Sequence, residues 1–300
     1  MEYLKGAATA SAGAIYVICR QLARAGGPVS GAELRRTVRP LPQQRADDEQ
    51  AKPTDALATS LRVAAGIGVI HEQGNSTWSV DSAIGDGLME AGDREAAWFR
   101  AELLSRINEE AMKSLADKAK VADLVLGMTW ILQQNPLNPF GVAFGKDAER
   151  TIARLALADG SAVKAVETEE QWRSFLRWVH ALGLARTVDV GRTRVVVADA
   201  STAIADSLGK MPKAGRASDW LTELRSRLPI FGATALLAQL PTPRAGWSEV
   251  PPAVSLGLLK LEKRGVLKME SADDGRGVVA VGLGGGARQV GIITVTGAGA

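Results

Sequence analysis

Residues that carry out acid–base or metal chemistry are scarce in this sequence. It contains two histidines, His71 and His180, and one cysteine, Cys19. A zinc site would need carboxylates for most of its ligands. One cysteine and two histidines also allow few Cys/His nucleophilic dyads. No G-x-S-x-G string is present to nominate a serine nucleophile. We therefore expect no catalytic residue, no metal and no cofactor, and a protein that is not an enzyme.

Arginine, which binds phosphate, provides the other chemistry in the sequence. Residues 171–197 hold five arginines and one aspartate, a net charge of +4. In the helical part of this segment, the spacing places Trp172, Phe175 and Val179 on one side. The candidate phosphate contacts lie on the other side and in the β-like run that follows: Arg173, Arg177, His180, Arg186, Arg192 and Arg194. The alternative is that these arginines only solvate the surface.

A second basic region lies at the start of the chain. Residues 1–45 carry seven bases and two acids, a net charge of +5. The candidate DNA contacts here are Arg35, Arg36, Arg39, Thr59 and Arg62. Backbone contact through these residues is one interpretation, and a solvated surface is the other.

Residues 252–270 carry a pattern that differs from the two basic regions. If Val254, Leu258 and Leu261 face a core, Leu256 and Leu259 point outward. The predicted partner-binding residues are Leu256, Leu259, Lys260 and Lys263. Exposed leucines followed by the acidic pair Asp273 and Asp274 disfavour phosphate and favour docking to another protein or a second copy of the chain. Alternatively, the leucines pack under the glycine-rich end of the chain.

Three places share one local pattern, a helix that ends in glycine and leads into strand, turn and strand. The segments are SLRVAAGIGVIHEQGNSTWSV, FLRWVHALGLARTVDVGRTRVVV and LGLLKLEKRGVLKMESADDGRGVVAV. In each, a leucine stands seven residues before a glycine, namely Gly68, Gly183 or Gly265. These glycines suit the left-handed residue that ends a helix. Further helical segments precede each copy, which gives the helix, helix, helix, hairpin order of a winged helix-turn-helix.

The predicted fold is mainly α with small β-hairpin wings, as three tandem winged-helix units joined by helical linkers. The ranges are unit one at 1–80, an acidic helical connector at 81–120, unit two at 121–208, a basic linker at 209–217, unit three at 218–283 and a glycine-rich tail at 284–300. In the connector, Trp98, Phe99 and Leu103 form the apolar side.

Composition limits the classes of protein that fit. The chain has 300 residues, is 46% hydrophobic and has a net charge of +3, which is low for a general polyanion binder. No uncharged apolar run approaches the roughly 18 residues that span a bilayer. A single cysteine forms no intrachain disulfide, so we expect a cytoplasmic protein that does not enter a membrane.

The arrangement resembles the tandem winged-helix proteins of bacteria. The bias toward alanine, arginine and glycine, with three such units and no catalytic domain, also resembles accessory components of bacterial DNA-modification or phage-defence islands, such as the G component of the Dpd deazapurine system. The resemblance implies a DNA-binding fold and a role beside other protein subunits.

Two functional hypotheses follow. In the first, a non-enzymatic adaptor binds duplex DNA through units one and two and a protein partner or a homodimer copy through unit three, within a defence or DNA-modification system or as a transcriptional regulator. In the second, the protein is a scaffold subunit whose winged helices are all docking modules. The low net charge favours the second, and the two basic regions favour the first.

Overall fold

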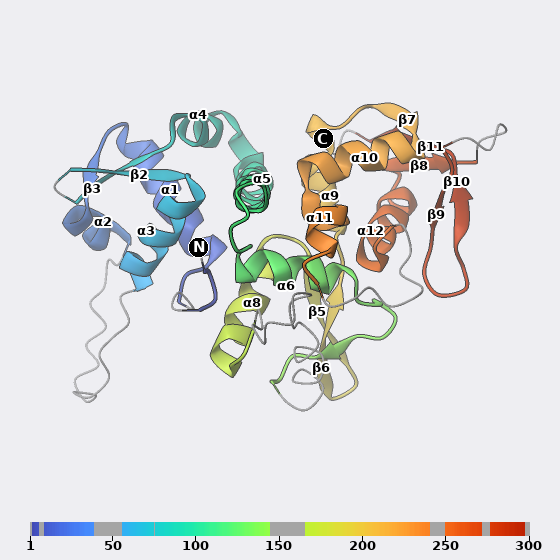
Figure 1. Cartoon of the computed structure of the whole chain (residues 1–300). Helices are drawn as coiled ribbons and strands as arrows, with labels where there is room; N and C mark the ends of the chain where they lie inside the picture. Colours follow the sequence, from blue (N-terminus) through green and yellow to red (C-terminus); the bar gives the residue numbers. More distant parts are fainter. Residues whose placement is uncertain are drawn as a thin grey trace.

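Figure 1 shows the computed structural model of the chain, which describes residues 2–5, 9–38, 56–74, 76–144, 166–240, 250–271 and 277–297. The described residues form many helices and four small sheets, in which every strand pairing is antiparallel. The expectation of a mainly α protein with small hairpins is confirmed.

Unit one contains three helices and a three-stranded sheet with the strand order β1-β3-β2. Its elements are α1 (Ala12–Ala25), β1 (Val29–Ser30), α2 (Gly31–Val38), α3 (Ala56–Ile67), β2 (Ile70–Gln73) and β3 (Thr77–Val80). Helix α1 begins at Ser11, whose side chain accepts a hydrogen bond from the Ala14 amide, and it ends at Gly26 with φ of 66°. Its apolar stripe, which includes Ile15, Ile18 and Leu22, is buried.

The three glycines that were expected to end helices all adopt the left-handed conformation. Gly68, Gly183 and Gly265 have φ values of 78°, 72° and 71°. Each follows the predicted helix within two residues and precedes a strand. The local pattern therefore predicted these helix ends correctly.

The segment between units one and two forms two helices joined by a 3₁₀ turn: α4 (Ser82–Glu90), η1 (Gly92–Arg94) and α5 (Glu95–Ala116). Phe99 and Leu103 are buried and Trp98 packs against the core, as expected. Helix α5 crosses the middle of the molecule between unit one and the C-terminal half (Figure 1). It is a central element of the fold and does more than connect two units.

Unit two repeats the strand order of unit one, here β4-β6-β5. Its described elements are α6 (Asp123–Leu132), β4 (Phe140–Gly141), α8 (Glu169–Ala181), β5 (Ala185–Val190) and β6 (Thr193–Ala198). The segment DAERTIARLAL (residues 147–157), whose pattern predicts the middle helix of this unit, lies outside the described residues.

The remaining described elements lie between residues 201 and 297 and are named unit three. Its elements are α9 (Ser201–Ser207), η2 (Leu208–Lys210), β7 (Ala214–Arg216), α10 (Ala217–Arg227), η3 (Pro229–Phe231), α11 (Thr234–Leu237), α12 (Pro252–Lys263), β8 (Leu267–Glu270), β9 (Val279–Val281), β10 (Arg288–Val290) and β11 (Ile292–Val295). The sheet order is β7-β11-β8, and β9 pairs with β10 separately.

The prediction that residues 267–281 form the hairpin of unit three is therefore wrong. Strand β8 pairs with β11 from the predicted tail, and β11 also pairs with β7 from the predicted basic linker. The β9–β10 hairpin is inserted between the two strands, which local sequence patterns could not reveal. Unit three is used below for residues 201–297.

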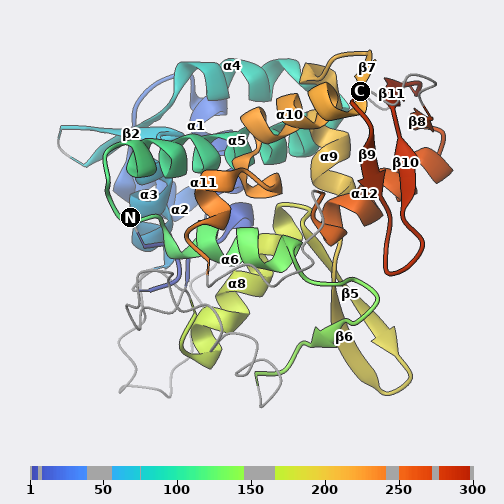
Figure 2. The ribbon, with the colours of Figure 1, turned by 45° about the vertical axis from the view of Figure 1, so that its right-hand side comes forward.

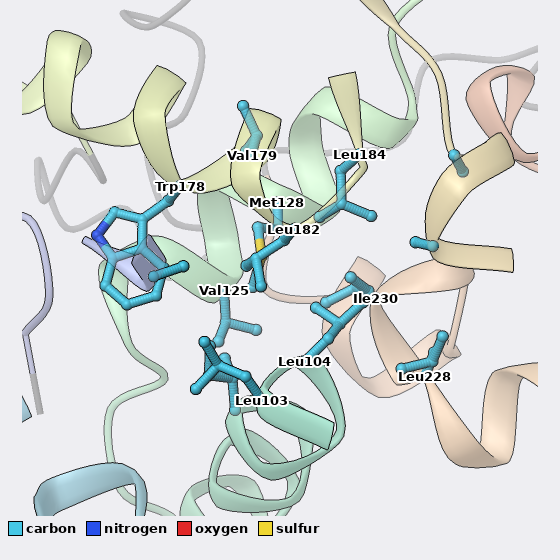
Figure 3. Close-up of a cluster of buried hydrophobic side chains, with 14 of the residues drawn as sticks. Leu103, Leu104, Val125, Met128, Trp178, Val179, Leu182, Leu184, Leu228 and Ile230 are labelled. Atoms are coloured by element: carbon cyan, nitrogen blue, oxygen red, sulfur yellow. The ribbon is translucent and has the colours of Figure 1, made fainter. Parts of the chain in front are cut away.

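The three units and the connector share one hydrophobic core, which extends from Tyr3 to Ile293. Figure 3 shows its centre, where Leu103 and Leu104 of α5 lie with Val125 and Met128 of α6, Trp178 of α8 and Ile230 of η3. All six side chains are 1% exposed or less. Because each unit contributes to the same core, the units do not have separate hydrophobic cores.

Candidate nucleic-acid interface

The β5–β6 hairpin projects from the body of unit two, at the lower edge of the molecule in Figures 1 and 2. Its base is anchored by Ala185, Val196 and Ala198, which are buried, while residues 186–194 are exposed. The strands pair in register from Ala185↔Ala198 to Val190↔Thr193, so Gly191 and Arg192 form the turn. Gly191 has φ of 60°, which a two-residue turn of this kind requires.

The tip of the hairpin combines cationic and apolar side chains. Arg192 is exposed at the turn, and Arg194 lies opposite Asp189 with Nε 3.1 Å from its carboxylate. Val188 and Val190 are 38% and 58% exposed. These two valines were not predicted as site residues. Their alternation with Thr187 and Asp189 is the signal that would have placed them on one face of the hairpin.

Helix α8 carries the other basic residues of unit two. Arg173 and Arg177 are exposed, as expected, and Arg173 pairs with Glu169 one turn earlier. An exposed pair at this spacing contributes little to stability. His180 is half-buried: Nδ1 lies 2.6 Å from the Leu176 carbonyl and Nε2 lies 2.9 Å from the Thr187 hydroxyl. These contacts hold His180 between α8 and the hairpin.

A buried carboxylate at the base of the hairpin joins two residues that were expected to bind different partners. Asp199 is 2% exposed, and its Oδ2 lies 2.6 Å from Arg186 Nε and 2.5 Å from Lys260 Nζ. Its Oδ1 accepts from the Ser201 amide. Burial raises the pKa of this carboxyl, but the bonds from Lys260 and Ser201 outweigh that effect and the pKa is lowered.

This cluster changes the interpretation of both cations. Lys260 is directed inward and links α12 to the end of unit two, so its expected place on an outer docking surface is wrong. Arg186 is half-exposed and already holds an ion pair. Asp199 was not predicted as a site residue, because nothing local to residue 199 shows that two distant cations approach it.

The candidate residues of unit one lie on two helices. Arg35 and Arg36 are exposed in the last turn of α2. On α3, Arg62 is exposed and Thr59 is half-buried. Arg39 lies outside the described residues.

In unit three the α12 leucines are more buried than expected. Leu256 and Leu259 are both half-buried, and Leu259 packs against the core. Gly257 on the same helix lies so close to the start of α9 that an added Cβ would stand 3.0 Å from the Ser201 nitrogen. Lys263 is exposed. Asp273 and Asp274 lie outside the described residues.

The described residues also bear on metal sites and membrane spans. Within the described ranges, no three His, Cys, Asp or Glu side chains come together as a metal site would require. Over the same ranges, no helix combines the length and apolar character needed to cross a membrane.

Comparison with known proteins supplies the family. The sequence matches the family model described as DpdG-like over residues 1–275. The chain belongs to the DpdG-like family. The match covers units one and two, the connector and unit three as far as β8, whereas β9–β11 lie beyond it. No curated protein and no solved structure matches the chain.

Membership in the DpdG-like family connects the chain with DNA modification and with a multi-protein system. The expected resemblance to the G component of the Dpd system is confirmed at this level. The family supplies a context for the basic hairpin but names no ligand for it.

Proposed function

We propose that this DpdG-like protein is a non-enzymatic adaptor that binds duplex DNA through winged-helix units and places other components of a DNA-modification system on it. The β5–β6 hairpin and the exposed side of α8 form the main DNA surface. The α2 and α3 residues of unit one add backbone contacts.

One observation supports the proposal: in each unit a short strand and, after a further helix, two later strands form a three-stranded sheet, although in unit three the β9–β10 hairpin is inserted between those two strands. The orders β1-β3-β2, β4-β6-β5 and β7-β11-β8 each place the last strand of the unit in the middle. We infer a winged helix from this sheet order, with the last two strands of units one and two as the wing and the preceding helix as the one that enters the major groove. In unit two the wing is long, projects freely and ends in arginine.

The chemistry at the wing supports DNA more than protein. Two arginines at the tip suit phosphate oxygens. The exposed valines, on the opposite face of the hairpin from Arg194, suit the apolar sugar edges of a groove into which the hairpin inserts. The scaffold alternative relies on the low overall charge, which does not describe this local surface.

The test changes Arg192 and Arg194 together to alanine and measures binding to a fluorescent 25-base-pair duplex by anisotropy at several salt concentrations. Each lost phosphate contact lowers the slope of log affinity against log salt by about 0.9, so the double variant should lose about 1.8. The fold should not change, because both side chains are exposed.

A matched control removes the same charge elsewhere. Lys113 and Arg227, 70% and 40% exposed on α5 and α10, are changed to alanine in the second variant. We expect its salt slope to equal that of the wild type. An unchanged slope for the hairpin variant, or equal losses in both variants, would remove the wing from the DNA surface.

A further inference from the structure

A groove outside the proposed DNA surface lies in unit one, between the C-terminal end of α1, strand β3 and helix α4. Its volume is about 230 Å³. The lining residues are mostly small or apolar, with one carboxylate: Leu22, Ala23, Gly26, Gly27, Ser79, Val80, Ser82, Gly85, Asp86 and Met89. This volume is below the 300–1,000 Å³ or so of typical small-molecule pockets, so the groove suits a single long side chain.

The rim of the groove is both apolar and acidic. Met89 is 63% exposed at the edge of the groove, so its side chain is available to a ligand that lies there. Asp86 lies one turn before it and Glu90 directly after it, and neither carboxylate has an ion-pair partner within the described part of the chain. Met89 therefore stands between two unneutralised negative charges.

The backbone adds to this negative field. Helix α1 ends at Gly26, which lines the groove, so the partial negative charge of the α1 C-terminus is directed toward it. Arg24 lies in the last turn of α1 but belongs to the side of the helix that carries Tyr16 and Arg20, where Glu95 pairs with Arg20. The groove thus has an apolar floor and an acidic rim.

We propose that this groove binds a basic segment of a partner protein, in which the aliphatic part of a lysine or arginine side chain lies over Val80 and Leu22. The cationic head would then reach Asp86, and Met89 would cover the neighbouring apolar residue of the segment. Long cationic side chains combine an apolar stem with a charged tip, which matches this arrangement. The charge of the rim opposes DNA.

The position of the groove fits two simultaneous contacts. Helix α4 lies along the upper edge of the molecule in both Figures 1 and 2, whereas the β5–β6 hairpin lies along the lower edge. A partner on α4 would leave the hairpin accessible. The proposal stands independently of DNA binding by the hairpin.

The experiment uses the full chain labelled with ¹³C at the methionine methyl groups, of which the sequence has six. Acetylated and amidated GKLKG is the probe, titrated to about 5 mM because a contact of this size gives a millimolar Kd. We expect the Met89 signal, assigned with Met89→Leu, to shift in a saturable manner. Signals of the buried Met128 and Met211 should not move.

Charge variants test the cause of binding. Asp86→Asn with Glu90→Gln should raise the Kd at least about threefold, a change of about 0.7 kcal/mol. Asp117→Asn is the matched control, because Asp117 is also exposed but caps the far end of the 22-residue α5, roughly 30 Å from its start. Its Kd should stay within about twofold of the wild type.

Four results would overturn the proposal. They are no shift of Met89 up to the highest peptide concentration, an equal shift with the acidic peptide GELEG, an unchanged Kd in the Asp86 and Glu90 variant, and a Met89 signal that moves when the protein alone is diluted. The last result would show that a second copy of the chain covers the groove.

Discussion

At Asp199, two cations from different units contact one buried carboxylate. We therefore expect substitutions of two lysines on the same helix, Lys260 and Lys263, to differ in their effect on stability. Lys260→Ala removes the closer cation, leaving a buried charge that only Arg186 faces. We expect the free energy of unfolding to fall by about 2–3 kcal/mol, somewhat less than the loss of a whole buried pair. Lys263 is exposed, and Lys263→Ala should change the free energy of unfolding by less than about 0.5 kcal/mol. Because the Asp199 pKa is lowered in the folded protein, its stabilisation is present above its unfolded pKa near 3.8 and is lost as pH falls through the folded value. The effect of Lys260→Ala, measured by urea unfolding, should therefore shrink below pH 4. Equal effects of the two variants at pH 7 would contradict this role of Lys260.

At the scale of elements, the glycines that end α8 and α12 share a conformation but not their surroundings. A Cβ added to Gly265 would meet no atom within 4 Å, so Gly265→Ala adds mainly the left-handed backbone cost, about 1 kcal/mol. A Cβ added to Gly183 would stand 2.8 Å from Thr202 Cβ and 3.1 Å from the Ala203 nitrogen, at the start of α9. Gly183→Ala should therefore cost about 2–4 kcal/mol, because α9 must also move. Thermal unfolding of the two variants ranks their melting temperatures. Gly68→Ala is the control, because a Cβ added to Gly68 also meets no atom within 4 Å. Equal melting temperatures for the Gly183 and Gly265 variants would show that α9 does not pack on this turn.

At the scale of the molecule, the shared core predicts that damage in α5 spreads to units two and three together. Leu104 is 1% exposed and lies beside residues of α6 and η3 (Figure 3), so Leu104→Ala should cost about 3 kcal/mol. Two ion pairs also tie α5 to the start of unit three, Arg100 with Asp206 and Lys210 with Glu102. Amide hydrogen exchange should therefore lose protection in α8 and in α10 together. Leu137→Ala is the control, because Leu137 is 64% exposed and its truncation should leave both segments protected. Loss of protection confined to α5 would mean that the units are stable independently.

Much of the local structure could be predicted because it depends on residues within about one helical turn of each other. Gly68, Gly183 and Gly265 end helices wherever the chain then turns into a strand, and the sides of α8 follow from the 3.6-residue repeat. The hairpins of units one and two were predicted correctly for the same reason, since their strands are adjacent in sequence. The same reasoning placed Phe99 and Leu103 on the buried side of α5.

The tertiary structure decided what depends on segments far apart in the chain. Strand β8 pairs with β11 rather than with the next strand, because the β9–β10 hairpin forms a sheet of its own. Lys260 and Leu259 lie inward because α9 packs on α12 and Asp199 supplies a buried charge. The sequence by itself therefore determined where elements begin and end and which residues are basic. Which cations remain available to a ligand was decided by the fold, because a buried carboxylate attracts distant cations only after the chain has brought them together.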